Sequence, residues 1–125
     1  MATFVLASHS RGVFQKMHCL MLSKGTHRVS LKKNGEYTAW ANVNPAGDPL
    51  YWTNAFYAYH HAHDDPMKVC VYAFGGQKEA TPELAVDRFA GGVIEIKGNL
   101  PIPVMFCITD TQDGDNRGGL TVEID

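Results

Sequence analysis

Short runs of strand-forming residues, separated by turn residues, constrain the fold of this chain more than any other feature. Gly, Pro and Asn stand between the runs, and Asn34–Gly35 is a tight-turn dipeptide that makes a hairpin only in a strand context. Several runs alternate apolar and polar side chains, as strands with one buried face do. Nine runs have this character, at residues 3–7, 13–22, 27–31, 37–43, 51–59, 68–74, 92–96, 103–109 and 120–124. Their spacing is typical of an antiparallel sandwich or barrel.

One segment carries helix signals instead. In "ATPELAVDRFAGG", Thr81 suits the N-cap, Pro82 suits the first helical position, and Gly91 suits the end. These signals predict a helix of about two turns. The sequence as a whole therefore predicts an all-β fold with at most one short helix.

The size and charge of the chain exclude several classes of protein. Its 125 residues fit a single domain, residues 1–125. The formal net charge is −2, whereas proteins that bind nucleic acid or anionic membranes normally present a basic surface. No apolar run approaches the roughly 20 residues that span a bilayer. Neither nucleic acid nor membrane insertion is expected.

The N-terminus and the cysteines indicate where the chain is made. "MATFVLASHSRG" has no basic region before its short apolar stretch, so we expect cytoplasmic synthesis without a signal peptide, with leaderless export left open. Cys19, Cys70 and Cys107 are odd in number and widely spaced. Buried free thiols are therefore expected, and not a disulfide framework.

The stretch "ITDTQDGDNRGGLTVEID" concentrates oxygen-bearing side chains just before the last predicted strand. Seven positions hold Asp110, Asp113, Asp115 and Asn116. Calcium takes about six to eight oxygen ligands, so these side chains can supply half of its shell. Three carboxylates held together without a cation would repel one another, and magnesium fits less well because it keeps several waters. The stretch predicts a calcium site, against the alternative of a solvated Asp/Gly turn.

The stretch "YHHAHDDP" holds the other cluster of functional side chains, His60, His61, His63 and Asp65. Its spacing resembles the HxHxDH signature of binuclear metallohydrolases, although proline replaces the final histidine. A second interpretation is a polar surface loop. A third is a ligand-contacting loop, in which His61 and His63 bond sugar hydroxyls and a nearby aromatic ring such as Trp52 stacks on the sugar.

The C-terminal "CITDTQDGDNRGGLTVEID" resembles the calcium loop and last strand of the LecA-type (PA-I-like) galactose-binding lectins. In that family an Asp leaves one strand, adjacent amide side chains follow, and a Gly precedes a closing strand. Upstream, "SKGTHRVSLKKNGEYTAW" is similar to an early strand of the family and its Gly-aromatic loop. Asp115 stands where the family has Asn, and the histidine loop lacks the neighbouring Gln.

The resemblance implies a fold and a role for each residue. The fold would be an antiparallel, jelly-roll-like β-sandwich, and a backbone carbonyl from the 37–40 stretch, taken as Tyr37, would complete the calcium shell. The histidine loop of the family falls at residues 59–65. The resemblance also implies a homo-oligomer and a galactose-type glycan as the partner.

We therefore expect a carbohydrate-binding protein and not an enzyme, with Ca²⁺ as its cofactor. The expected metal ligands are Asp110, Asp113, Asp115, Asn116 and Tyr37, and the expected sugar contacts are His61, His63, Asp110, Asp115, Asn116 and Trp52. Two alternatives stay open: a small metal-dependent hydrolase that uses His60, His61, His63 and Asp65, and a ligand-free β-sandwich interaction domain.

Overall fold

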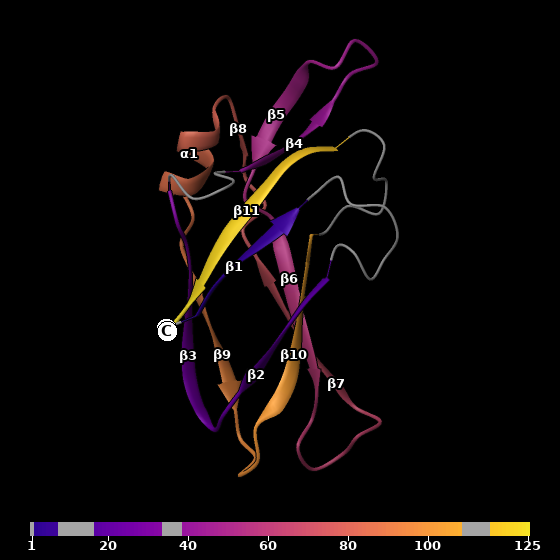
Figure 1. Ribbon diagram of the computed structural model, residues 1–125, viewed down its shortest axis with the longest axis vertical. Helices are drawn as coiled ribbons and strands as arrows, with labels where there is room; N and C mark the ends of the chain where they lie inside the picture. Colours follow the sequence, from indigo (N-terminus) through magenta and orange to yellow (C-terminus); the bar gives the residue numbers. More distant parts are fainter. Residues whose placement is uncertain (1, 8–16, 34–38, 109–115) are drawn as a thin grey trace.

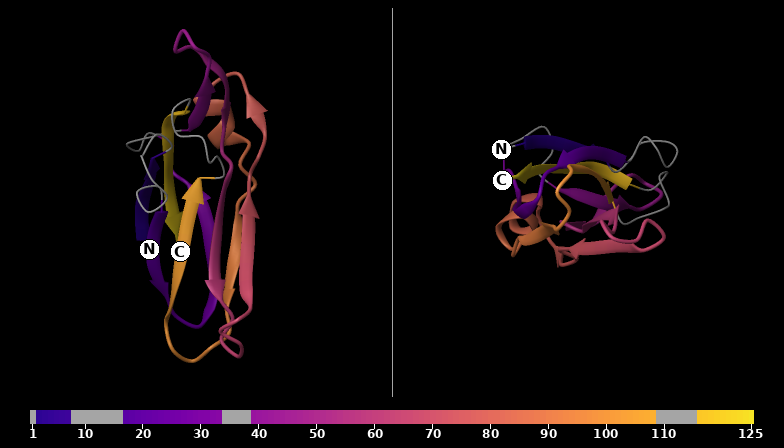
Figure 2. Two further views of the ribbon diagram at one scale, coloured as in Figure 1. Left: turned by 90° about the vertical axis from the view of Figure 1, so that its right-hand side faces the viewer. Right: turned by 90° about the horizontal axis from the view of Figure 1, so that it is seen from below.

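Two antiparallel sheets packed face to face make up the protein (Figures 1 and 2). The computed structural model describes residues 2–7, 17–33, 39–108 and 116–125. Seen end-on in Figure 2, the indigo β1 and yellow β11 lie in one layer and the coral β7 lies in the other. The predicted all-β sandwich is confirmed.

The larger sheet has seven strands. They run in the order β8-β5-β4-β11-β3-β9, and β1 pairs with β11. The strands are β1 (Ala2–Ala7), β3 (Gly25–Leu31), β4 (Trp40–Val43), β5 (Pro49–Thr53), β8 (Lys78–Glu79), β9 (Gly92–Ile96) and β11 (Asn116–Ile124).

The smaller sheet has four strands in the order β2-β10-β6-β7. They are β2 (Met17–Leu22), β6 (Phe56–His61), β7 (Val69–Phe74) and β10 (Ile102–Ile108). Alternation is strict in β6, where every even-numbered residue is buried and the odd-numbered residues are at least partly exposed, whereas β10 ends on three consecutive buried residues.

Strand β11 holds the larger sheet together. It pairs with β1 over residues 119–124, with β3 over 122–124 and with β4 over 116–118. Thr121 accepts a hydrogen bond from the Lys32 amide, and the Gly119 amide donates to the Ala39 carbonyl. Strands β3 and β4 therefore follow one another along β11, and they do not pair as a hairpin. The Asn34–Gly35 dipeptide itself lies outside the described residues.

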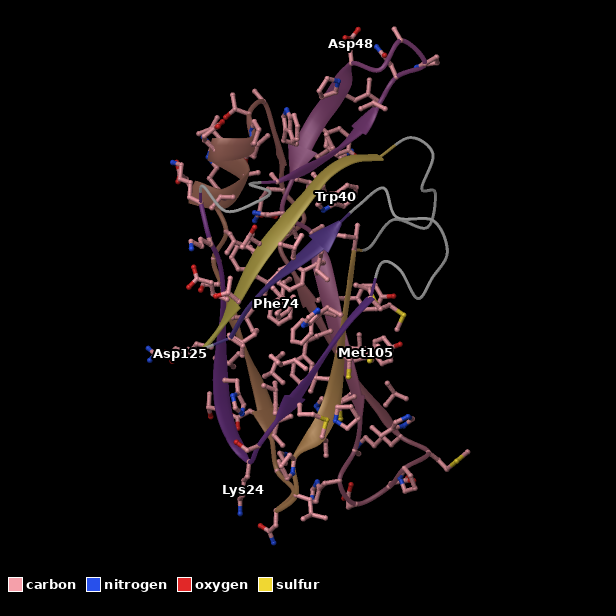
Figure 3. All side chains as sticks on the ribbon, viewed as in Figure 1. Lys24, Trp40, Asp48, Phe74, Met105 and Asp125 are labelled. Atoms are coloured by element: carbon pink, nitrogen blue, oxygen red, sulfur yellow. The ribbon has the colours of Figure 1, made fainter. Side chains whose placement is uncertain are left out.

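The core lies between the inner faces of the two sheets. Phe56 stacks on Phe74 with ring centroids 4.9 Å apart, and Phe4 meets Phe106 at 4.8 Å. Phe74 lies in the interior in Figure 3. Trp40 is buried beside them and donates from Nε1 to the Ala55 carbonyl at 2.9 Å. Leu, Ile and Val side chains of both sheets pack around these rings and complete the core.

The predicted helix is present as α1 (Pro82–Asp87), with the Thr81 side chain accepting from the Leu84 amide at 3.2 Å. It packs on β5 and β8. Glu79, which is buried in β8, accepts from Arg88 Nη1 at 2.7 Å just after the helix. Among the described residues no helix is long and apolar enough to cross a membrane.

The structure divides the predicted 51–59 strand in two. The break falls at Asn54, which is fully buried between β5 and β6. Its Nδ2 donates to the Ala85 carbonyl of α1 at 2.6 Å, and its Oδ1 accepts from the Gly76 amide at 2.9 Å. Gly75 has φ 69° and lies so close that a Cβ there would collide with the Asn54 side chain. Asn54 therefore joins the strand break, the helix and the β7–β8 connection.

We predict that Asn54→Ala lowers the free energy of unfolding by about 2–4 kcal/mol, because the carbonyl of the buried Ala85 loses its Asn54 donor and the bond to the Gly76 amide is lost as well. Urea unfolding of the purified protein measures this change. Asn99→Ala, at an exposed position, should change it by less than about 0.5 kcal/mol. Equal effects of the two substitutions would contradict the role given to Asn54.

Candidate functional site

The predicted site residues lie at two opposite ends of the sandwich. At the end called here the acidic-loop end, β10 finishes at Ile108 and β11 begins at Asn116. At the histidine-loop end, β6 finishes at His61 and β7 begins. Ile108 pairs with Phe56, the first residue of β6, so His61 lies five residues further along, about 17 Å away. Figure 1 shows β10 and β6 running between these ends.

In the described part of the chain, the histidines of the expected sugar site and the two residues that bound the acidic segment lie at opposite ends of the sandwich. His61 and His63 follow β6 to one end, whereas Ile108 and Asn116 bound the acidic segment at the other. The predicted ligands Asp110, Asp113, Asp115 and Tyr37 lie outside the described residues. Asn116 begins β11, where its backbone pairs with Asn42 of β4.

Close backbone contact joins the chain beside the Tyr37 segment to the chain beside the acidic segment. Gly118 pairs with Trp40, and its φ of +84° is one that residues with side chains rarely adopt. A Cβ on Gly118 would lie 2.5 Å from the Ala39 carbonyl oxygen. The next amide, of Gly119, donates to that same oxygen at 3.2 Å. Glycine at 118 is what lets these two backbones meet.

Trp52 lies at the acidic-loop end. It pairs with Ala41 of β4, which pairs in turn with Arg117 of β11, so two strand spacings, about 10 Å, separate Trp52 from β11. Thr53 shares a row with the buried Trp40, so alternation turns the half-buried Trp52 to the opposite, outer face of the sheet. Of the residues predicted to contact sugar, Trp52 and Asn116 are the two described ones at this end.

His60 is buried at the histidine-loop end and both of its ring nitrogens have partners. Nδ1 lies 2.8 Å from the His61 carbonyl oxygen, and Nε2 lies 3.1 Å from the Tyr72 hydroxyl. That hydroxyl donates to the Glu95 carbonyl at 3.2 Å, which links β7 of one sheet to β9 of the other. Burial raises the pKa of Tyr72 and keeps it neutral. His60 therefore helps to hold the two sheets together at this edge, through Tyr72. No local sequence motif predicts this role.

The other members of the histidine cluster diverge from His60. His61 is the next residue on β6 and is exposed on the opposite face. His63 packs against Gly98, because a Cβ added to Gly98 would lie only 2.8 Å from the Cβ of His63. Asp65 accepts the Met67 amide at 2.9 Å and so shapes its own turn. Within the described ranges no three His, Cys, Asp or Glu side chains gather to hold a metal.

Two larger hollows accompany these features, and a third, of about 300 Å³, is lined by His60, Tyr72 and Glu95. One, of about 450 Å³, lies at the histidine-loop end and is lined by His61, His63 and Asn99 above the apolar Ile102 and Pro103. The other, of about 600 Å³, lies between the end of α1 and the outer face of β3 and β9. Each of the two larger hollows is a shallow surface feature without a convergent set of functional groups.

The remaining histidines are structural where they are described. His18 stacks on Phe4 with ring centroids 4.1 Å apart, and burial lowers its pKa. His27 places Nε2 2.7 Å from the Ser23 carbonyl oxygen. His9 lies outside the described residues.

Comparison of the chain with protein-family models, with curated proteins and with solved structures gives no match. The function is therefore argued from the chain's own residues.

We predict that Gly118→Ala destabilises the protein more than Gly47→Ala. Both glycines have similar positive φ values, +84° and +88°, so both substitutions carry the same backbone cost of about 1–2 kcal/mol. Only the Cβ that Gly118→Ala adds would collide with backbone, at the Ala39 carbonyl oxygen. Nothing lies within 4 Å of a Cβ on Gly47. The extra cost should be about 1–3 kcal/mol in urea unfolding. Equal values would show that β4 and β11 separate freely at this point.

Proposed function

We propose that this protein is a calcium-dependent carbohydrate-binding protein, a lectin, and not an enzyme. One observation carries the proposal. The segment with three aspartates within 110–115, followed by Asn116, joins two strands of different sheets at one end of a β-sandwich. The close contact between Gly118 and Ala39 fastens the chain after this segment to the chain after Tyr37.

The chemistry of these residues suits a hard cation. In the proposed site, oxygens of Asp110, Asp113, Asp115 and Asn116 hold Ca²⁺. The Tyr37 carbonyl adds a neutral oxygen from the neighbouring segment. A cation also offsets the repulsion among three carboxylates in a short stretch of chain. Strand β11, paired on both edges, gives such a site a rigid support.

Sugar recognition in the proposed site starts from the ion. Two neighbouring hydroxyls of a galactose-type sugar replace waters on Ca²⁺, and Asp110, Asp115 and Asn116 accept hydrogen bonds from them. Trp52, on the outer face of the same end, offers an apolar ring surface. Single sites for such small polar ligands bind weakly, so several copies acting together would supply avidity. A homo-oligomer belongs to the proposal for this reason.

The hydrolase alternative is weakened by the described residues. His60 and His61 point to opposite faces of β6, and both nitrogens of His60 have partners within the protein. A binuclear metal site needs several ligands converging on one point. The ligand-free interaction domain is the alternative that the calcium experiment below excludes or supports.

We predict that calcium raises the thermal unfolding midpoint relative to EGTA, and that galactose raises it further only when calcium is present. A ligand that binds only the folded state stabilises it by mass action. Asp110→Ala should abolish both shifts. The matched control is Asp64→Ala, an exposed aspartate at the histidine-loop end, which should preserve both. An unfolding midpoint that is the same in EGTA and in calcium would contradict the proposal and favour a solvated turn for the acidic segment.

The separation of the two ends gives an independent prediction. His61→Ala and His63→Ala should leave calcium-dependent sugar affinity within about twofold, because His61 ends β6 and His63 follows it at the end away from the acidic loop. Isothermal titration with galactose measures this affinity. A loss of binding in either variant, with the fold intact by circular dichroism, would place the sugar at the histidine loop.

A further inference from the structure

The outer face of the four-stranded sheet has an unusual composition. It consists of the odd-numbered residues of β2, β6, β7 and β10, from 17 to 21, 57 to 61, 69 to 73 and 103 to 107, and is called here the odd face. One row across it reads Cys19, Met105, Tyr59, Val71. Among its twelve described positions none is Asp, Glu, Lys or Arg. Most even-numbered residues of the same strands turn to the core, and Cys107 is the one odd-numbered position that is buried.

Much of the odd face is open to solvent in the single chain. Val71 is 65% exposed, Met21 58% and Val69 47%. Burial raises the pKa of Tyr57 to about 12 and also raises the pKa values of Tyr59 and Cys107, so these three groups stay uncharged. Contiguous apolar surface of this kind on a soluble protein marks a contact site.

The outer face of the larger sheet provides the internal comparison. Its outward positions carry Arg28 on β3, Glu95 on β9 and Glu123 on β11. Arg28 also forms a salt bridge with Asp125 at 3.1 Å. An exposed sheet face normally alternates with the core in this way, polar outside and apolar inside. The odd face departs from that rule across all four of its strands.

We propose that the odd face packs against the odd face of a second copy of this chain, as a twofold dimer. Four strands about 4.8 Å apart, each six residues of about 3.3 Å, give a flat footprint of roughly 400 Å². Two copies therefore cover roughly 800 Å² before the relief of the side chains is counted. Weak, reversible protein contacts lie below about 1,200 Å², so contact over the whole face has the size of a small, reversible interface.

The charge pattern selects a second copy as the occupant. A twofold contact sets each patch against itself, so any charge near the axis would oppose its own image. The odd face has no Asp, Glu, Lys or Arg to be opposed, and its one histidine, His61, lies at the end of β6, whereas the outer face of the larger sheet carries Arg28, Glu95 and Glu123. Three methionines, at 17, 21 and 105, add flexible side chains that adapt to an apolar partner. Face-to-face sheet packing about 10 Å apart is a standard geometry for such surfaces.

The proposed dimer rests on the described sheet and not on calcium or sugar. Measurements in EGTA therefore keep its failure distinct from a failure of the lectin proposal. We expect sedimentation equilibrium of the wild type in EGTA to approach twice the 13.8 kDa chain mass as concentration rises. Val71→Glu should raise the dissociation constant about tenfold or more, because it buries an unpaired carboxylate in the contact.

The matched control is Val93→Glu. Val93 lies on β9, also an edge strand, and is 46% exposed, but it belongs to the outer face of the larger sheet. This variant should dimerise as the wild type does, and unchanged unfolding midpoints should show that both variants fold. The proposal is overturned if the wild type stays at 13.8 kDa, or if Val93→Glu dissociates the dimer and Val71→Glu does not. A monomer that cosediments with phosphatidylcholine vesicles would also overturn it and assign the face to lipid.

Discussion

Strand β11 is the element on which the rest of the structure depends. It pairs with β1 along one edge and with β4 and then β3 along the other, so it unites strands from across the chain. Its alternate side chains, among them Leu120, Val122 and Ile124, enter the core. The same strand starts where the acidic segment ends. Any ion held by that segment would therefore be coupled directly to the most heavily paired strand of the sheet.

The alternation of side chains along strands separates the surfaces of this molecule. Adjacent histidines on β6 face opposite sides of the sheet. His60, His61 and His63, which are close in the sequence, therefore lie in three different environments. The same rule gives the four-stranded sheet one face for the core and one for a partner. The proposed ligand site occupies an end of the sandwich and the proposed contact occupies a flank. The two functions could therefore operate together without competing for surface.

Sequence patterns predicted the sandwich well, whereas the predicted calcium and sugar ligands stay a prediction, and the differences in the described part have physical reasons. Alternation located most strands, and Thr81 with Pro82 located the helix, because these signals are local. The division at Asn54 escaped prediction because its partners, Ala85 and Gly76, are more than twenty residues away. The separation of His61 from Ile108, which precedes the acidic segment, depends on the pairing of β6 with β10, which no local pattern encodes. The sequence shows that the odd-numbered positions of β2, β6, β7 and β10 are mostly apolar, but it does not show that these four strands belong to one sheet.

The pairing of β1 with β11 sets the mechanical character of the fold. Ala2 lies opposite Ile124, and the register continues in antiparallel order to Ala7 and Gly119. A force applied at Ala2 and Ile124 would load the hydrogen bonds one after another, as in opening a zipper, and not all at once, as in shear. Unravelling from that point would need little force. A force applied instead at Ala7 and Gly119 would separate the same two strands in the reverse order, starting from their other end.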